Sequence, residues 1–126
     1  MKKDNKGFSL VELIIVIAIM AVLVGVLAPQ FIKYVEQSRR SRDIQTAQEI
    51  REAVLADIAD GSLTGTNTIT TFTSLSTVSE QPTVSGHVSG ATSFSATYNA
   101  TSGTCWVTCG TYTLTTESGA SQYKAA

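Results

Sequence analysis

The longest apolar run in the chain lies near its start. Residues 8–28 read FSLVELIIVIAIMAVLVGVLA, and the one charged residue among them is Glu12. About 20 residues at about 1.5 Å rise per residue cross the roughly 30 Å hydrocarbon core of a bilayer, so this run predicts a membrane-spanning helix. A carboxylate inside such a helix is costly unless it is partnered, which makes Glu12 a candidate functional residue.

The helical pattern continues over residues 30–60, where apolar side chains recur at three- and four-residue spacing on one face. This stripe consists of Ile44, Ala47, Ile50, Val54, Leu55 and Ile58. Pro29 removes a helical hydrogen bond and Gly25 weakens the turn before it, so we expect a kink near Pro29. The sequence therefore predicts one helix of about fifty residues that ends near Gly61.

Residues 61–126 have the alternating pattern of β-strands. Runs rich in β-branched and aromatic residues predict strands over 68–73, 92–98, 104–108 and 111–116, with a loop over 74–91 that contains at most a short edge strand at 84–88. The apolar sheet face that packs on the helix is expected to carry Phe94, Tyr98, Trp106 and Leu114. The expected fold class is α+β, with the long N-terminal helix packed on a small C-terminal antiparallel sheet.

Composition divides the chain at Asp60. Residues 61–126 contain 28 Ser or Thr and few charges, which also fits low-complexity disorder, although the alternating aromatics favour a sheet. The expected segments are a leader over 1–7, a membrane helix over 8–29, an amphipathic helix over 30–60 and a Ser/Thr-rich sheet head over 61–126, with 30–126 as one globular domain. A net charge of −1 gives no reason to expect a nucleic-acid site.

The charged stretch EQSRRSRD, residues 36–43, has no apolar residue. Glu36 with Arg40, and Arg39 with Asp43, are spaced to pair along an exposed helix. Two interpretations stay open at this stage, namely a solvated helix face or a set of ion pairs between subunits.

The basic leader before the apolar run indicates how the chain is oriented and processed. Lys2, Lys3 and Lys6 outweigh Asp4, which predicts a cytoplasmic N-terminus and export of the rest. A secretory signal has a shorter apolar core and a cleavage site after it. Here Gly7 precedes the run, so if cleavage falls between Gly7 and Phe8, the apolar helix remains on the mature protein. The alternative is an uncleaved signal anchor.

The segment from Gly7 to Pro29 resembles the N-terminal signature of type IV pilins and pseudopilins. The matching features are glycine, then phenylalanine, then Glu12 as the fifth residue after the glycine, then an apolar run to a proline. This covers about a quarter of the chain, and the short leader and the phenylalanine resemble the type IVa branch. The resemblance implies a prepilin peptidase that cuts after Gly7 and methylates the amine of Phe8.

The resemblance also implies a role for Glu12 in assembly. In that family the glutamate of one subunit is thought to neutralise the N-terminal amine of its neighbour, here the amine of Phe8. Pairing recovers much of the cost of burying each charge, so a subunit would move from lipid into a growing filament. The simpler interpretation places Glu12 near the membrane interface, favoured by the positive end of its own helix. The implied partners are other copies of the chain, the peptidase and an inner-membrane assembly machinery.

Cys105 and Cys109 form a candidate disulfide. If both lie in one extended strand, their Cα atoms are about 13 Å apart, which is beyond disulfide reach, so a bridge requires a bend between them. One histidine and two cysteines cannot supply the four ligands of zinc, and no cofactor or metal is expected. His87 stands alone in a predicted loop without a nucleophile–base set, so an enzyme is not expected.

Three function classes remain open. The first, and the one the residues favour, is the structural subunit of a type IV pilus, present in the membrane as a single-pass precursor and outside the cell as a filament. The second is a pseudopilin of a secretion or DNA-uptake machine; the scarcity of carboxylates after Asp60 argues against the calcium site of the main secretion pseudopilin. The third is a membrane-anchored binding domain that does not polymerise.

Overall fold

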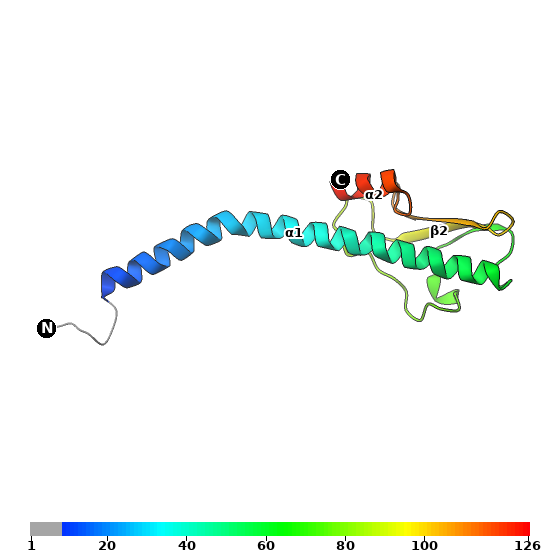
Figure 1. Ribbon diagram of the computed structural model, residues 1–126, viewed down its shortest axis with the longest axis horizontal. Helices are drawn as coiled ribbons and strands as arrows, with labels where there is room; N and C mark the ends of the chain where they lie inside the picture. Colours follow the sequence, from blue (N-terminus) through cyan, green and yellow to red (C-terminus); the bar gives the residue numbers. More distant parts are fainter. Residues whose placement is uncertain (1–8) are drawn as a thin grey trace. The chain divides into compact units, whose positions relative to one another are not determined.

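The computed structural model describes residues 9–126, which form an α+β fold (Figure 1). The chain makes two compact units, one that reaches Val35 and one that spans Glu36–Ala126, and each is described by itself. The leader over 1–7 and the cleavage residues Gly7 and Phe8 lie outside the described residues. The elements in order are α1 (Leu10–Ala59), β1 (Thr66–Ile69), the 3-10 helix η1 (Phe72–Ser74), β2 (Phe94–Asn99), β3 (Thr104–Cys109), β4 (Tyr112–Thr113) and α2 (Glu117–Ala125).

α1 is a single helix of 50 residues, as the sequence predicts. Pro29 lies inside it, and the helix continues to Ala59. Gly61 then takes a φ of +87°, and its N–H donates to the carbonyl of Ile58 at 3.2 Å. Glycine adopts this left-handed conformation without strain, which explains why the helix ends here. The kink expected at Gly25 and Pro29 stays a prediction.

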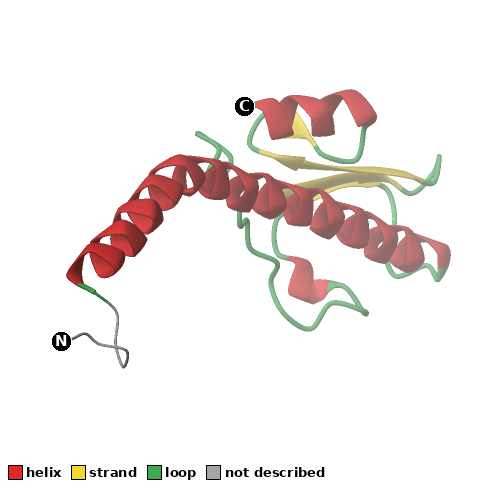
Figure 2. Ribbon diagram, turned by 60° about the vertical axis from the view of Figure 1, so that its left-hand side comes forward, coloured by secondary structure: helices red, strands yellow, loops and turns green. Residues whose placement is uncertain are grey.

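The four strands form one antiparallel sheet in the order β1-β2-β3-β4 (Figure 2). In the register of β2 and β3, Ala96 faces Val107 and Tyr98 faces Cys105. Side chains alternate between the two faces of a strand, so this register defines an inward face that packs on the core. Its members on β2 and β3 are all buried: Phe94, Ala96, Tyr98, Cys105, Val107 and Cys109.

The core of the second unit joins this inward face to the helix stripe. Ala47, Ile50 and Val54 of α1 are buried in the same cluster as the inward strand residues, and Ile44 and Ile58 are partly buried beside them. The predicted docking of the stripe on the sheet is therefore confirmed. The cluster is completed by Ala53, Phe72, Leu75, Val88, Ala91, Leu114 and Tyr123.

Trp106 was expected on the core face of the sheet, and that prediction is wrong. Its side chain is 43% exposed, while its neighbours Cys105 and Val107 are buried. The strand reads TCWVTC, and either alternate set contains apolar side chains. The set with two cysteines and a valine fills the interior because its smaller side chains fit against Phe94, Ala96 and Tyr98, and the indole is left on the opposite face.

Two strand predictions also need correction, whereas the loop predicted over 74–91 is confirmed apart from Ser74, which ends η1, and it contains no strand at 84–88. The strand predicted over 68–73 is β1 at Thr66–Ile69 followed by η1. The strand predicted over 111–116 is only the two-residue β4. The helix α2 follows it and was not predicted at all, although the side chain of Thr116 accepts from the N–H of Gly119 at 3.2 Å as a helix N-cap.

Gly119 shows why the chain turns into α2 at this position. A Cβ added there would lie 2.0 Å from the carbonyl oxygen of Thr113. Glycine therefore permits the first turn of α2 to lie directly against the end of β4. In the sequence Thr-Glu-Ser-Gly, residues 116–119, the threonine is a recognisable helix N-cap. Helix propensity does not reveal that the glycine is needed for close packing against β4.

Candidate functional site

α1 begins with a capped first turn that contains Glu12. The backbone N–H of Glu12 donates to Oγ of Ser9 at 3.2 Å, and the N–H of Leu13 donates to the carbonyl of Ser9 at 3.1 Å. Ser9 therefore acts as the N-cap, and Ser9-x-x-Glu12 has the spacing of a capping box ahead of an apolar run. This role of Ser9 was not predicted from the sequence. The cap fixes where the helix begins and places the Glu12 carboxylate in its first turn.

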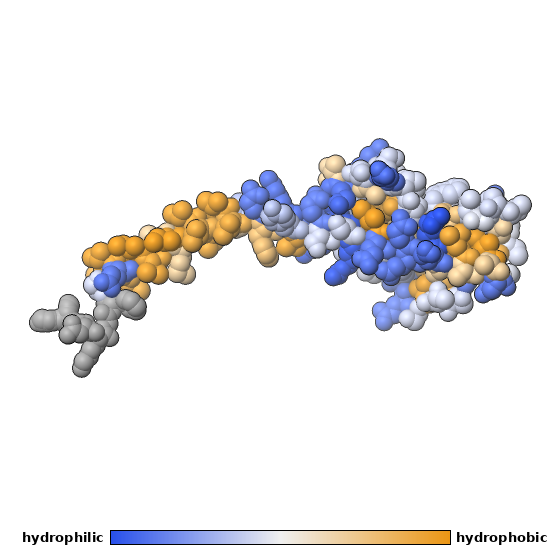
Figure 3. Space-filling model, viewed as in Figure 1, coloured by the Kyte–Doolittle hydropathy of each residue, from blue (hydrophilic) through white to orange (hydrophobic). Residues whose placement is uncertain are grey.

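The first unit exposes apolar side chains on every side of α1. Every large apolar residue from Leu10 to Tyr34 is at least 50% exposed, and the helix is long and apolar enough to cross a membrane (Figure 3). Soluble monomers rarely expose apolar patches larger than a few hundred Å². A helix that is apolar all round needs lipid or protein around it. At Gly25 an added Cβ would meet nothing within 4 Å, so this unit leaves the small residue free to be packed by another chain.

Glu12 has no ion pair among the described residues. It is the sole carboxylate in the apolar run, and its side chain is exposed on a surface that must be covered by lipid or protein. An unpaired carboxylate is costly in either environment. The described residues therefore supply no cationic partner for Glu12, and its pairing with the amine of Phe8 on a neighbouring copy stays a prediction.

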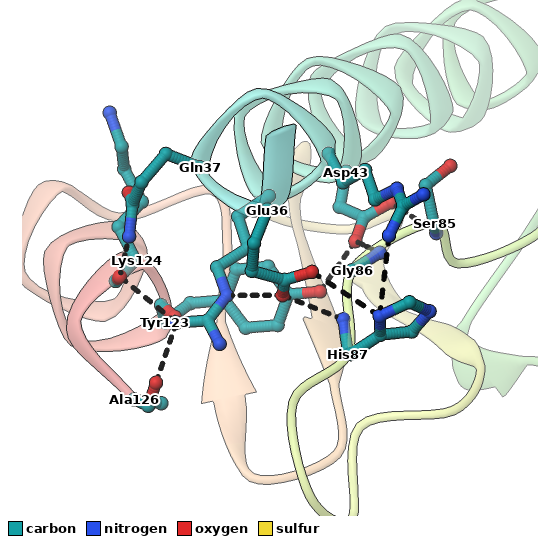
Figure 4. A network of polar contacts seen from close by, with 11 residues as sticks. Glu36, Gln37, Asp43, Ser85, Gly86, His87, Tyr123, Lys124 and Ala126 are labelled. Carbon is teal, nitrogen blue, oxygen red and sulfur yellow. Dashed lines mark hydrogen bonds and ion pairs between the residues drawn. The ribbon is translucent and has the colours of Figure 1, made fainter. Parts of the chain in front are cut away.

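A second set of polar residues fixes the head to α1. Asp43 is fully buried and accepts from the N–H of Ser85 at 2.7 Å, from the N–H of Gly86 at 2.8 Å and from the hydroxyl of Tyr123 (Figure 4). Burial raises the pKa of the Tyr123 hydroxyl, and its hydrogen bond to Asp43 raises it further, so the hydroxyl stays a donor. One carboxylate thus ties the 85–86 segment and α2 to the same turn of α1.

Arg40 makes the matching contacts one turn earlier. Its Nε donates to Oε2 of Glu36 at 2.7 Å, and its Nη1 donates to the carbonyl oxygens of Lys124 at 3.0 Å and Ala126 at 2.6 Å. Burial raises the pKa of Glu36, but the hydrogen bonds from Arg40 and from the His87 N–H lower it more, so the pKa lies below the ordinary value of a glutamate. These contacts therefore stabilise the folded chain fully at a pH above the ordinary glutamate pKa, and the stabilisation is lost as the pH falls through the lower pKa of the folded state.

The pairing of Arg39 with Asp43 is a wrong prediction, whereas the pairing of Glu36 with Arg40 is confirmed. Nη1 of Arg39 lies 3.4 Å from Nδ1 of His87 instead. The sequence did contain a signal for the burial of Arg40 and Asp43. Arg40 and Asp43 continue the three- and four-residue spacing of the apolar stripe, and so does Asp57, which accepts from the N–H and hydroxyl of Ser76.

Removing the Asp43 carboxylate should destabilise the head. Asp43→Ala leaves two backbone N–H groups and the Tyr123 hydroxyl buried without their acceptor, and each unsatisfied donor costs about 1–3 kcal/mol. We expect a loss of about 3 kcal/mol or more in the free energy of unfolding, measured by urea denaturation of residues 30–126. Arg42→Ala, on the exposed side of the same helical turn, is the control. Equal midpoints for the two variants would show that the buried network does not hold the head.

Cys105 and Cys109 are free thiols, and the candidate disulfide is not formed. Both lie in β3, the extended arrangement that keeps residues four apart out of bonding reach. Both are buried, at 5% and 0% exposure, and burial raises the pKa of each thiol to about 11.

These thiols should resist alkylation while the protein is folded. The thiolate is the reactive form, and at pH 8 a thiol with a pKa of about 11 is almost entirely protonated. We expect iodoacetamide to leave both cysteines unmodified at pH 8 and to modify both once urea has unfolded the chain, with intact mass as the measurement. Rapid modification without denaturant would contradict the buried positions of the two side chains.

Comparison with known proteins agrees with this arrangement. The family model of the prokaryotic N-terminal methylation motif matches residues 2–28. The chain is 37% identical over 65 residues to a type IV major fimbrial protein FimA of Dichelobacter nodosus. The aligned residues make up 52% of this chain and 42% of the relative. A second FimA of that organism is 38% identical over 61 residues, covering 48% of this chain and 39% of the relative. No solved structure matches the chain.

These matches define the first part of the chain. Residues 2–28 match the model of an N-terminal methylation motif, and about half of the chain is similar to type IV major fimbrial proteins. The resemblance to type IV pilins that the segment from Gly7 to Pro29 predicts is therefore confirmed. The chain spans less than half the length of the curated relatives that it matches.

Proposed function

We propose that this chain is the structural subunit of a type IV pilus. The observation that carries the proposal is the first part of α1, which is apolar on all sides, exposed along its length and capped at a turn that contains Glu12. The methylation motif over residues 2–28 and the likeness to fimbrial proteins support the same function. The apolar helix anchors the precursor in the membrane and afterwards forms the filament core.

Processing and assembly follow from this function. A prepilin peptidase cuts between Gly7 and Phe8 and methylates the new amine of Phe8. Near neutral pH such an amine is largely cationic. Glu12 of one subunit then pairs with the Phe8 amine of its neighbour, which removes two unpaired charges from the apolar core and sets the axial stagger. An inner-membrane machinery drives the transfer from lipid to filament, and the N-terminus of the precursor faces the cytoplasm.

The direct test is to recover surface filaments and weigh their subunit. Filaments sheared from cells that express the chain should contain it without MKKDNKG and with one added methyl group at Phe8, as measured by intact mass and N-terminal sequencing. A chain that stays in the membrane with its leader attached, in cells that make no filament of it, would identify a signal anchor and overturn the proposal.

A further inference from the structure

The outward face of the sheet carries an exposed indole that the core does not require. Trp106 is 43% exposed, and in the described part of the chain after Tyr34 it is the one large apolar side chain that is exposed. Elsewhere in the second unit the large apolar residues are buried or partly buried. The indole of Trp106 therefore offers a flat apolar surface that the core of the second unit leaves uncovered.

The register of the strands identifies the neighbours of Trp106. Trp106 pairs with Thr97, and Thr97 pairs with Thr68, so these three side chains form a row across β3, β2 and β1. The hydroxyls of Thr68 and Thr97 are hydrogen-bonded at 3.1 Å. Alternation along the strands assigns nine residues to this outward face: Thr66, Thr68, Ser95, Thr97, Asn99, Thr104, Trp106, Thr108 and Thr113.

The chemistry of these nine residues is uniform apart from the indole. None of them is buried and none is charged, and eight carry a hydroxyl or an amide. A face without cations has no means of neutralising phosphates, which argues against nucleic acid as its ligand. Adjacent strands lie about 4.8 Å apart, so the face presents closely spaced hydrogen-bonding groups beside one flat aromatic surface.

We propose that this outward face, centred on Trp106, binds a neutral polysaccharide. A pyranose ring has one apolar C–H side, which can stack on the exposed indole, and hydroxyls at its rim, which can exchange hydrogen bonds with the Thr, Ser and Asn side chains. An open face buries little of a small sugar, so an extended polymer that covers several strands fits better than a monosaccharide. In a filament of many copies, repeated weak contacts add up to firm attachment.

The test measures binding of the full chain to insoluble neutral polysaccharides. Filaments sheared from cells, and in parallel the detergent-solubilised chain, are sedimented with chitin or cellulose particles, and the unbound protein is quantified. We expect Trp106→Ala to weaken binding about tenfold on at least one of the two polymers, and Trp106→Tyr to restore part of it. Thr68→Ala combined with Thr97→Ala should weaken binding while the indole is intact.

The control is Thr77→Ala, an exposed threonine outside this face, which should bind like the parent. The solubilised chain separates the two proposals, because it can bind polysaccharide even if the chain forms no filament. No binding by either form, or equal binding by the parent and Trp106→Ala, would overturn the inference. So would loss of lateral bundling of filaments in Trp106→Ala without loss of polysaccharide binding, which would assign the face to contacts between copies.

Discussion

Replacing Val54 with aspartate should unfold the head. Val54 is fully buried where α1 meets the inward face of the sheet. The substitution removes an apolar side chain whose burial is worth about 1.5–3 kcal/mol and places a charge where nothing compensates it. We expect the free energy of unfolding to fall by about 4 kcal/mol or more, a large part of the 5–15 kcal/mol that a domain usually has.

The measurement is thermal unfolding of a fragment over residues 30–126, followed by circular dichroism. Ala56→Asp is the matched control, since it introduces the same side chain two residues away on the exposed side of α1. The control should melt near the parent, and Val54→Asp should show no cooperative transition. If Val54→Asp melts within a few degrees of Ala56→Asp, the helix is not docked on the sheet as described.

The sequence predicts the parts of this fold that depend on long or strict periodicity. The fifty-residue helix, its end at Gly61 and the strands β2 and β3 all follow from apolar spacing and a glycine stop. α2 could not be predicted in the same way, because the Thr-rich residues 111–116 directly before it favour strand, and only the close approach of Gly119 to Thr113 makes the turn into a helix fit. The position of Trp106 could not be predicted either. Both faces of β3 carry apolar side chains, and the volume available in the core decides which face is buried.

The candidate site also has a part that the local sequence predicts and a part that it does not. Glu12 stands out from the sequence because a single charge interrupts an apolar run. The spacing of Arg40 and Asp43 on the apolar stripe indicates that they face the core, but it does not indicate what they contact, because most of their partners lie more than forty residues away, such as Gly86 and Lys124. No local pattern encodes those partners, and a charged stretch on a helix ordinarily indicates solvent exposure.

Glu12→Ala should be made, inserted and cleaved, yet fail to enter filaments. The substitution makes the apolar run more hydrophobic, so membrane insertion does not suffer. What is lost is the partner of the Phe8 amine, and an uncompensated charge in a dry core costs about 3–5 kcal/mol. We expect the filament yield to fall to about a tenth or less of the parent yield while the membrane pool of cleaved protein rises.

The comparison is made by expressing each variant alone, shearing the cells and quantifying the sheared and membrane fractions. Val11→Ala, next to Glu12 in the same first turn, is the control for a small change at that place, and it should assemble. Ser9→Ala removes the helix cap but keeps the carboxylate, so it should assemble better than Glu12→Ala. Normal filament yield from Glu12→Ala would mean that the carboxylate has no part in assembly.

We expect copies of the chain to polymerise through the first part of α1, with Glu12 paired to the Phe8 amine of a neighbour. The decisive measurement is electron cryomicroscopy of sheared filaments, by helical reconstruction at a resolution that shows side chains. Helices from Leu10 onwards should pack at the filament axis, with a carboxylate oxygen of Glu12 within hydrogen-bond distance of the Phe8 nitrogen of an adjacent subunit. Filaments held together by contacts between heads alone, with Glu12 facing solvent, would contradict it.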